Sequence, residues 1–168
     1  MTRERSLILD SVQIAQKLMR MAHEIHENNY MEKELTLVGV VGRGSEVAAR
    51  LGKLLSSISD LTVFVEKIEL DKEKPLNSEV TFSGELKSLK GKSVVLVDDV
   101  LNSGRTLIYA AKFLLDAEPK KLATAALVDR FHRKFPIRAD FVGLTLSTNL
   151  KEHISVEMMK GKEAVYLE

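Results

Sequence analysis

The chain contains three continuous runs of mostly apolar residues. They cover Leu35–Val41, Val94–Val97 and Leu122–Val128, and continuous apolar runs of this length are typical of strands buried on both faces. The alternating segment Leu61–Leu70 predicts a further strand, because apolar and polar positions exchange at the period of two that strands require. Weaker strand patterns cover Ser6–Leu9 (as an edge strand), Phe141–Leu146 and Ile154–Met158.

Segments with helical spacing lie between these strands. Apolar residues recur at intervals of three and four after Asp10, which stands three residues before Gln13 and predicts a capping box; this pattern ends at Asn28–Asn29. Further helices are predicted over 42–58 and 105–116. The alternation of strands and helices predicts an α/β fold with a mostly parallel, twisted sheet flanked by helices. Ligands of such sheets bind beyond the carboxyl ends of the strands, here after each of the three apolar runs.

Length and composition narrow the class of protein. The 168 residues suit one domain over 1–168, and the absence of cysteine excludes thiolate nucleophiles, CxxC redox chemistry and cysteine-ligated metals. Lys and Arg number 25 against 24 Asp and Glu, so the net charge of +1 does not suggest a generic nucleic-acid binder. No apolar run is long enough to span a membrane or to form a signal peptide. We therefore expect a cytoplasmic protein.

The strongest local pattern begins at the second apolar run. Two adjacent carboxylates follow this run, and a glycine-containing turn then leads into a predicted helix. Backbone N–H groups at such a turn, with the helix dipole behind them, form a phosphate site. Carboxylates beside it suit sugar hydroxyls or Mg²⁺, since they accept hydrogen bonds and are hard oxygen ligands. The candidate residues are Asp98, Asp99, Val100, Leu101, Asn102, Ser103, Gly104, Arg105 and Thr106.

Each of these features alone is also consistent with a strand that ends in polar residues before an ordinary helix. The complete run from Val94 to Thr106 is far more specific than its parts. It contains no Walker lysine and does not follow the GxGxxG pattern. A ribose 5-phosphate, held at its hydroxyls and at its phosphate, is the ligand that the run predicts.

The run resembles the phosphoribosyl-diphosphate binding motif of the type I phosphoribosyltransferases. The similarity extends to KGKSVVLVDDVLNSGRTL, ATAALVDRFHRKFPIRADFVG and MAHEIHENN, which in these relative positions resemble the bacterial pyrimidine-operon regulators that double as uracil phosphoribosyltransferases. It covers most of the chain and is best over 90–143. The resemblance implies the type I fold with a small hood, ribose hydroxyls and Mg²⁺ held by Asp98 and Asp99, and a 5-phosphate held by the loop after them.

The same resemblance assigns two further segments to the diphosphate. Arg43 and the backbone of Gly42, Gly44 and Ser45 match the pyrophosphate loop, in which Gly42 replaces a threonine. Two glycines around an arginine also let the backbone approach an anion closely, although an ordinary helix start has the same pattern. The polar stretch over 71–84 is expected to be a mobile lid, with Lys72 in place of the family's arginine. A solvated cluster of charges is the other interpretation of its first residues.

The segment after the third apolar run matches the wall of the family's base pocket. Val128, Asp129 and Arg130 contribute backbone groups to this wall by resemblance, and Phe131 replaces a glycine. An unpaired buried donor or acceptor discriminates strongly against the wrong base. Asp129 has a second interpretation, in which its carboxylate only anchors Arg130.

These assignments predict a Mg²⁺-dependent enzyme that converts uracil and phosphoribosyl diphosphate to UMP and diphosphate. A purine-base phosphoribosyltransferase and an RNA-binding attenuator of pyrimidine genes that senses UMP or UTP are the alternatives. By resemblance we also expect a homodimer or a higher homo-oligomer. The candidate RNA-binding residues are Arg20, His23, His132, Arg133 and Arg138.

A solvated basic edge, with His23 facing the core or capping a helix, explains those five residues equally well. Met19, Asn28 and Leu144 replace a threonine, a basic residue and a lysine of the resembled regulators. Each lost phosphate contact weakens binding to RNA. We therefore predict that RNA regulation is weak or absent.

Overall fold

A six-stranded sheet forms the centre of the molecule in the computed structural model, which describes residues 4–168. Its strand order is β4-β3-β2-β5-β6-β7, and every neighbouring pair is parallel except β3 with β4. The predicted α/β fold is confirmed. The strands are β2 (Glu34–Val40), β3 (Thr62–Glu69), β4 (Thr81–Phe82), β5 (Ser93–Leu101), β6 (Lys121–Asp129) and β7 (Phe141–Thr145).

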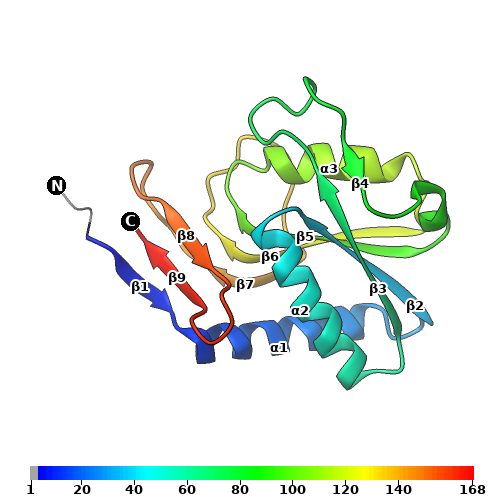
Figure 1. Cartoon of the computed structure of the whole chain (residues 1–168), viewed down its shortest axis with the longest axis horizontal. Coiled ribbons are helices and arrows are strands. Elements are labelled where there is room, and N and C mark those ends of the chain that lie inside the picture. Colours follow the sequence, from blue (N-terminus) through cyan, green and yellow to red (C-terminus); the bar gives the residue numbers. More distant parts are fainter. Residues whose placement is uncertain (1–3) are drawn as a thin grey trace.

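Helices cover both faces of this sheet (Figure 1). The helices α1 (Ser11–Asn28) and α2 (Arg43–Ile58) pack on one face, and α3 (Arg105–Leu115) packs on the other. Strand β5 shows why both faces need covering: Val95 and Val97 pack in the core with α1 and α2, whereas Val94 and Leu96 pack in the core with α3. A short 3₁₀ helix, η1 (Leu86–Leu89), precedes β5.

The predicted start of α1 is confirmed in detail. Asp10 accepts a hydrogen bond from the Gln13 backbone N–H at 2.8 Å, and the Gln13 side chain accepts one from the Asp10 N–H at 2.9 Å. Two donors that a helix start leaves unpaired are thereby satisfied. No helix in the described part of the chain is long and apolar enough to cross a membrane.

A second, three-stranded antiparallel sheet lies beside the carboxyl ends of the main strands (Figure 1). It consists of β1 (Ser6–Leu9), β9 (Ala164–Leu167) and β8 (Ile154–Glu157), in that order, and we call it the hood. The expected edge strand at Ser6–Leu9 is confirmed. The strand at 164–167 was missed, because four residues are too few to establish a period of two.

The second apolar run extends further than predicted. Strand β5 continues from Val97 to Leu101, so the acidic pair lies within the strand rather than after it. The additional residues are held by pairing with β6, in which Val100 lies opposite Val128 and Leu101 opposite Asp129. The polar stretch over 71–84 also contains β4, whose two residues pair with the end of β3.

Candidate functional site

The three predicted ligand-binding loops meet at one edge of the main sheet, where β2, β5 and β6 end side by side (Figure 1). The loop after β2 leads into α2, the loop after β5 leads into α3, and the segment after β6 leads to β7. Parallel pairing brings these ends together, although they are far apart in the sequence. The hood lies beside the same edge.

Asp98 and Asp99 occupy the centre of this edge. The Asp98 side chain is buried, with the residue 4 % exposed, and its Oδ1 accepts a hydrogen bond from the Asp99 N–H at 2.8 Å. Burial raises the pKa of the Asp98 carboxyl well above its ordinary value and the charge of Asp99 raises it further, whereas Lys72 opposes the rise. The negative charge of Asp98 therefore has little solvent around it, and a cation or hydroxyl ligand would stabilise it.

The start of α2 packs directly on Asp98. A side chain at Gly44 would place its Cβ 2.9 Å from Asp98 Oδ1 and 3.1 Å from Val97 O. Gly42 has a φ of 102° and begins α2 without a side-chain cap. The Ser45 hydroxyl donates to Gly42 O at 2.7 Å. Arg43 is exposed and borders a hollow of about 660 Å³ that Glu157 and Lys162 of the hood also line.

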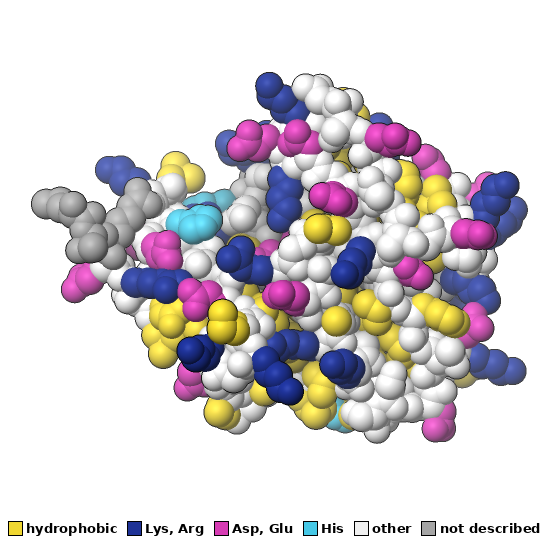
Figure 2. All heavy atoms as spheres, viewed as in Figure 1, with side chains coloured by type: hydrophobic (Ala, Val, Ile, Leu, Met, Phe, Trp, Pro, Cys, Tyr) yellow, Lys and Arg dark blue, Asp and Glu magenta, His cyan; other side chains and the backbone are white. Residues whose placement is uncertain are grey.

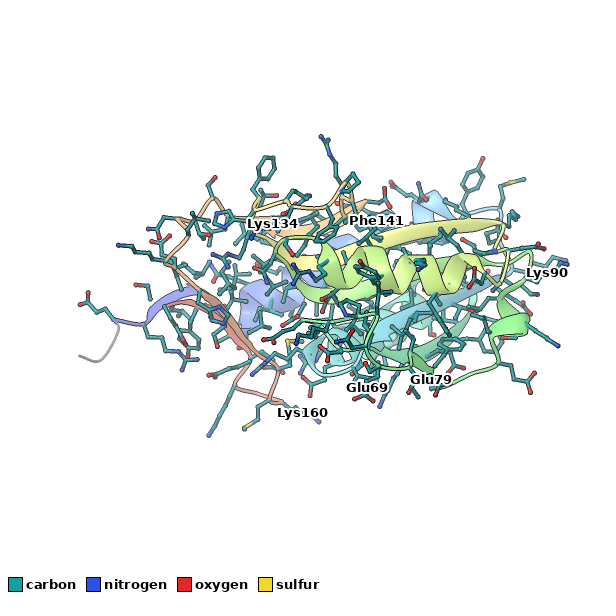
Figure 3. The ribbon with its side chains drawn as sticks, turned by 90° about the horizontal axis from the view of Figure 1, so that it is seen from above. Glu69, Glu79, Lys90, Lys134, Phe141 and Lys160 are labelled. Carbon is teal, nitrogen blue, oxygen red and sulfur yellow. The ribbon has the colours of Figure 1, made fainter. Side chains whose placement is uncertain are left out.

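The loop between β5 and α3 surrounds a small hollow of about 40 Å³. Gly104 begins α3 with a φ of 87°, a left-handed conformation that favours glycine, and the Ser103 hydroxyl accepts a hydrogen bond from the Arg105 N–H at 3.3 Å. The Ser103 carbonyl accepts hydrogen bonds from the N–H groups of Lys134 (2.8 Å) and Phe135 (3.0 Å), and Figure 3 shows Lys134 beside this end of α3. The remaining N–H groups of the first helical turn are the donors that an anion requires.

The lid segment begins on an ordered turn. Asp71 Oδ1 accepts hydrogen bonds from the N–H groups of Glu73 and Lys74, both at 2.9 Å, and these bonds lower the pKa of its carboxyl. Arg105 Nη1 donates to the Glu73 carbonyl at 3.4 Å, which joins the lid to the start of α3. Lys72 is exposed, and its charge acts on Asp98. The contact of Lys72 with the diphosphate stays a prediction.

Asp129, at the end of β6, anchors Arg133 rather than Arg130, so the second interpretation of this carboxylate was wrong. Arg133 donates to both Asp129 oxygens at 2.8 and 2.7 Å, and the Phe131 N–H donates to Oδ1 at 2.9 Å. Burial raises the pKa of the Asp129 carboxyl, but the bonds from Arg133 and Phe131 outweigh it and the net shift is downward. The arginine four residues along has the reach for a bidentate pair, whereas Arg130 points elsewhere.

Phe131 has a φ of 67° in the position where the resembled family has glycine. A non-glycine residue in this region costs of order 1–2 kcal/mol. Its ring is exposed, and the guanidinium carbon of Arg133 lies 5.7 Å from the ring centroid. The strained backbone therefore holds an aromatic side chain in solvent beside the end of β6.

Arg130 joins the site to the hood side of the molecule. Its side chain contacts the segment over 148–152, between β7 and β8, and this segment also lines a cavity of about 810 Å³ with His132. Sequence reasoning missed Thr148, Asn149 and Glu152. Their stretch has no motif or period, so no local signal could have identified them.

The five candidate RNA-binding residues lie on α1 and on the segment after β6. Arg20 pairs with Glu24 at 2.7 Å and donates to the Gly143 carbonyl at 2.7 Å. Arg133 is held by Asp129, and His132 Nε2 lies 2.5 Å from the Thr148 carbonyl. His23 and Arg138 are exposed. On the face that Figure 2 shows, basic and acidic side chains are interspersed and form no continuous basic patch.

This arrangement suits a phosphorylated sugar. One edge of the main sheet brings together the acidic pair and Lys72 of the lid segment. The helices α2 and α3 also begin there, each at a glycine that has no side chain to cap the helix. Residues 4–168 contain no cluster of three or more His, Asp or Glu side chains with metal-binding geometry.

A mostly parallel sheet with these loops defines a type I phosphoribosyltransferase. Residues 4–159 match the model of the phosphoribosyl transferase domain, and the chain belongs to this family. Its relatives include the Bifunctional protein PyrR of Pelotomaculum thermopropionicum, which is 38 % identical in an alignment that covers 99 % of this chain and 97 % of the relative. The Bifunctional protein pyrR of Enterococcus faecalis strain OG1RF is also 38 % identical, covering 90 % of this chain and 88 % of the relative.

Solved structures of other phosphoribosyltransferases share the fold. The hypoxanthine phosphoribosyltransferase of Trypanosoma cruzi matches with a TM-score of 0.80 at 17 % identity, over 96 % of this chain and 95 % of that chain. A hypoxanthine-guanine phosphoribosyltransferase of Bacillus anthracis matches with a TM-score of 0.71 at 23 % identity, over 89 % and 86 % of the two chains. At these identities the likeness concerns the fold alone.

Proposed function

We propose that the protein transfers the phosphoribosyl group of phosphoribosyl diphosphate to uracil, giving UMP and diphosphate. The observation that carries the proposal is the acidic pair near the carboxyl end of β5, with the start of α3 at Gly104 a few residues further along the same stretch of chain. Family membership supports the transfer. The choice of uracil rests on the resemblance of residues 90–143 to the pyrimidine-operon regulators. A purine base is the second candidate.

The donor set at the end of β5 fits Mg²⁺. Asp98 and Asp99 offer hard carboxylate oxygens, and Mg²⁺ in nucleotide enzymes is commonly held by one or two carboxylates, several waters and substrate phosphates. These two residues would hold the ion. When bound, it supplies positive charge that neutralises the departing diphosphate.

The protein's own groups supply positioning and electrostatic stabilisation rather than a covalent nucleophile. In the reaction the bond from the anomeric carbon to the diphosphate oxygen breaks, a bond from that carbon to a base nitrogen forms, and the base loses a proton. The carboxylates of Asp98 and Asp99 hold the ribose hydroxyls. Arg43 and Lys72 stabilise the negative charge on the leaving group. The loop before α3 holds the 5-phosphate.

Base specificity is tested with a panel of nucleobases. The purified protein is incubated with phosphoribosyl diphosphate, Mg²⁺ and either uracil, hypoxanthine or guanine, and the nucleotide formed is measured. We expect UMP to form fastest, because pairing with the wrong base leaves buried donors or acceptors unsatisfied. Faster turnover of a purine would contradict the uracil assignment and would leave the phosphoribosyltransferase assignment intact.

RNA binding is a further candidate function, because the chain resembles the pyrimidine-operon regulators and relatives of the chain are called bifunctional. We expect weak binding to the leader RNA of the organism's own pyrimidine genes, since Arg133 is paired with Asp129 and Arg20 with Glu24. The measurement compares leader RNA with a scrambled RNA, with and without UMP, at near-physiological salt. Tight binding that is selective for sequence and enhanced by UMP would overturn this prediction.

A further inference from the structure

The guanidinium of Arg130 connects two loops of the site to each other. Its Nη1 donates to Asn102 Oδ1 at 3.1 Å, in the loop before α3. Its Nε donates to Thr148 Oγ1 at 3.1 Å, and its Nη2 donates to the carbonyls of Asn149 at 3.3 Å and Glu152 at 2.6 Å. The residue is only 8 % exposed.

All four acceptors of this buried cation are neutral oxygens. Within residues 4–168 Arg130 forms no salt bridge, and the neighbouring carboxylate of Asp129 is engaged by Arg133 through two bonds. Buried charges are costly and are ordinarily paired with an opposite charge. The positive charge of Arg130 therefore stays available to balance an anion bound at this edge.

The bond to Asn102 fixes which way its amide faces. Because Oδ1 accepts from Arg130, the Nδ2 group, with its two N–H donors, points away from that bond within the amide plane. Asn102 is exposed and lines the same hollow as Ser103 and Gly104. A ligand in this hollow could accept hydrogen bonds from those N–H groups as well as from the N–H groups at the start of α3.

We propose that Arg130 is a positioning residue for the phosphate of the substrate. Through Asn102 it presents amide donors to that phosphate, and its own unpaired charge is balanced by the phosphate when the substrate binds. The Arg130 guanidinium also bonds to the segment over 148–152. It therefore fixes the position of the loop before α3 relative to that segment. This inference rests on the proposed binding of phosphoribosyl diphosphate.

Calorimetric binding of phosphoribosyl diphosphate, with inorganic phosphate as a simpler probe, tests the proposal. Asn102→Ala and Arg130→Gln are each expected to weaken binding about tenfold, the effect of one hydrogen bond to a charged group. Because they act through one contact, the double variant should be little weaker than either single variant. Arg130→Lys keeps the charge and should recover part of the affinity. As a control, Lys112→Gln removes an exposed charge from the last turn of α3, at the end of the helix away from the site, and should change binding less than about twofold.

Asn102→Asp gives a readout that does not depend on binding or turnover. The new carboxylate provides Arg130 with the partner it lacks, so the thermal midpoint of unfolding should rise while substrate binding weakens more than in Asn102→Ala. Asn102 is exposed, so its variants remain informative even if Arg130→Gln does not fold. Unchanged affinity in the Asn102 variants, effects that multiply in the double variant, or a lower midpoint in Asn102→Asp would overturn the inference. If the unsubstituted protein does not bind phosphoribosyl diphosphate, the proposed function fails as well.

Discussion

Replacing either carboxylate of the acidic pair by its amide should reduce phosphoribosyl transfer by about 10²-fold, the effect of losing an electrostatic contact of about 3 kcal/mol. Asp98→Asn and Asp99→Asn preserve the size of the side chain but remove the charge that ribose hydroxyls and Mg²⁺ require. Turnover is measured with saturating uracil and phosphoribosyl diphosphate. Near-normal turnover in both variants would exclude this pair as the site.

The stability of Asp98→Asn provides the control, and its sign follows from the raised pKa of Asp98. The folded protein holds this proton more tightly than the unfolded chain, whose carboxyl has the ordinary pKa of 3.8. The stability that the group contributes is therefore greatest below this value and is lost as the pH rises through the raised pKa. Asparagine has no charge to desolvate and can still accept the Asp99 N–H.

We therefore expect Asp98→Asn to be at least as stable as the parent at neutral pH. The difference in the free energy of unfolding between the variant and the parent should become smaller as the pH falls toward the ordinary pKa of the Asp98 carboxyl. Urea unfolding over a range of pH values measures this difference. An inactive variant that is also destabilised at neutral pH would show that the loss of turnover reflects damage to the fold.

Gly44→Ala should reduce both stability and turnover. The added methyl group would lie 2.9 Å from Asp98 Oδ1, 3.1 Å from Asp98 Cα and 3.1 Å from Val97 O. Two of these atoms belong to the backbone of a central strand, so α2 has to move away from β5. Such overpacking costs about 1–3 kcal/mol. Because the displaced carboxylate belongs to the acidic pair, we expect turnover to fall by at least about tenfold, since each 1.36 kcal/mol of barrier is tenfold in rate.

Gly52→Ala is the matched control in the same helix. Its methyl group would meet Val65 Cγ2 at 2.7 Å, but this side chain is 40 % exposed and can move toward solvent. Alanine also favours the helix by about 1 kcal/mol over glycine. Unfolding and turnover of the two variants are compared under the same conditions. Equal loss of activity in both would mean that the contact with Asp98 has no special role.

The positions of the main strands and helices could be predicted because they depend on local patterns. A run such as Leu122–Val128 has to be buried on both faces, which places it in the interior of a parallel sheet. Asp10 and Gln13 satisfy each other within one helical turn, so the capping box needs no distant partner. The acidic pair and the turn before α3 also occupy one continuous stretch. The chain sequence alone therefore determined which residues of this stretch lie at the edge of the sheet.

Tertiary structure alone decided which groups complete that edge. Arg130 donates a hydrogen bond to Glu152, which lies in a segment without hydrophobic periodicity or a motif. Asp129 binds Arg133, although Arg130 is its neighbour in the chain. The hood forms only when the first and last described strands meet, with Ser6 opposite Leu167. Local periodicity carries no information on such pairings, because side-chain partners and strand neighbours are chosen by packing between segments that lie far apart in the sequence.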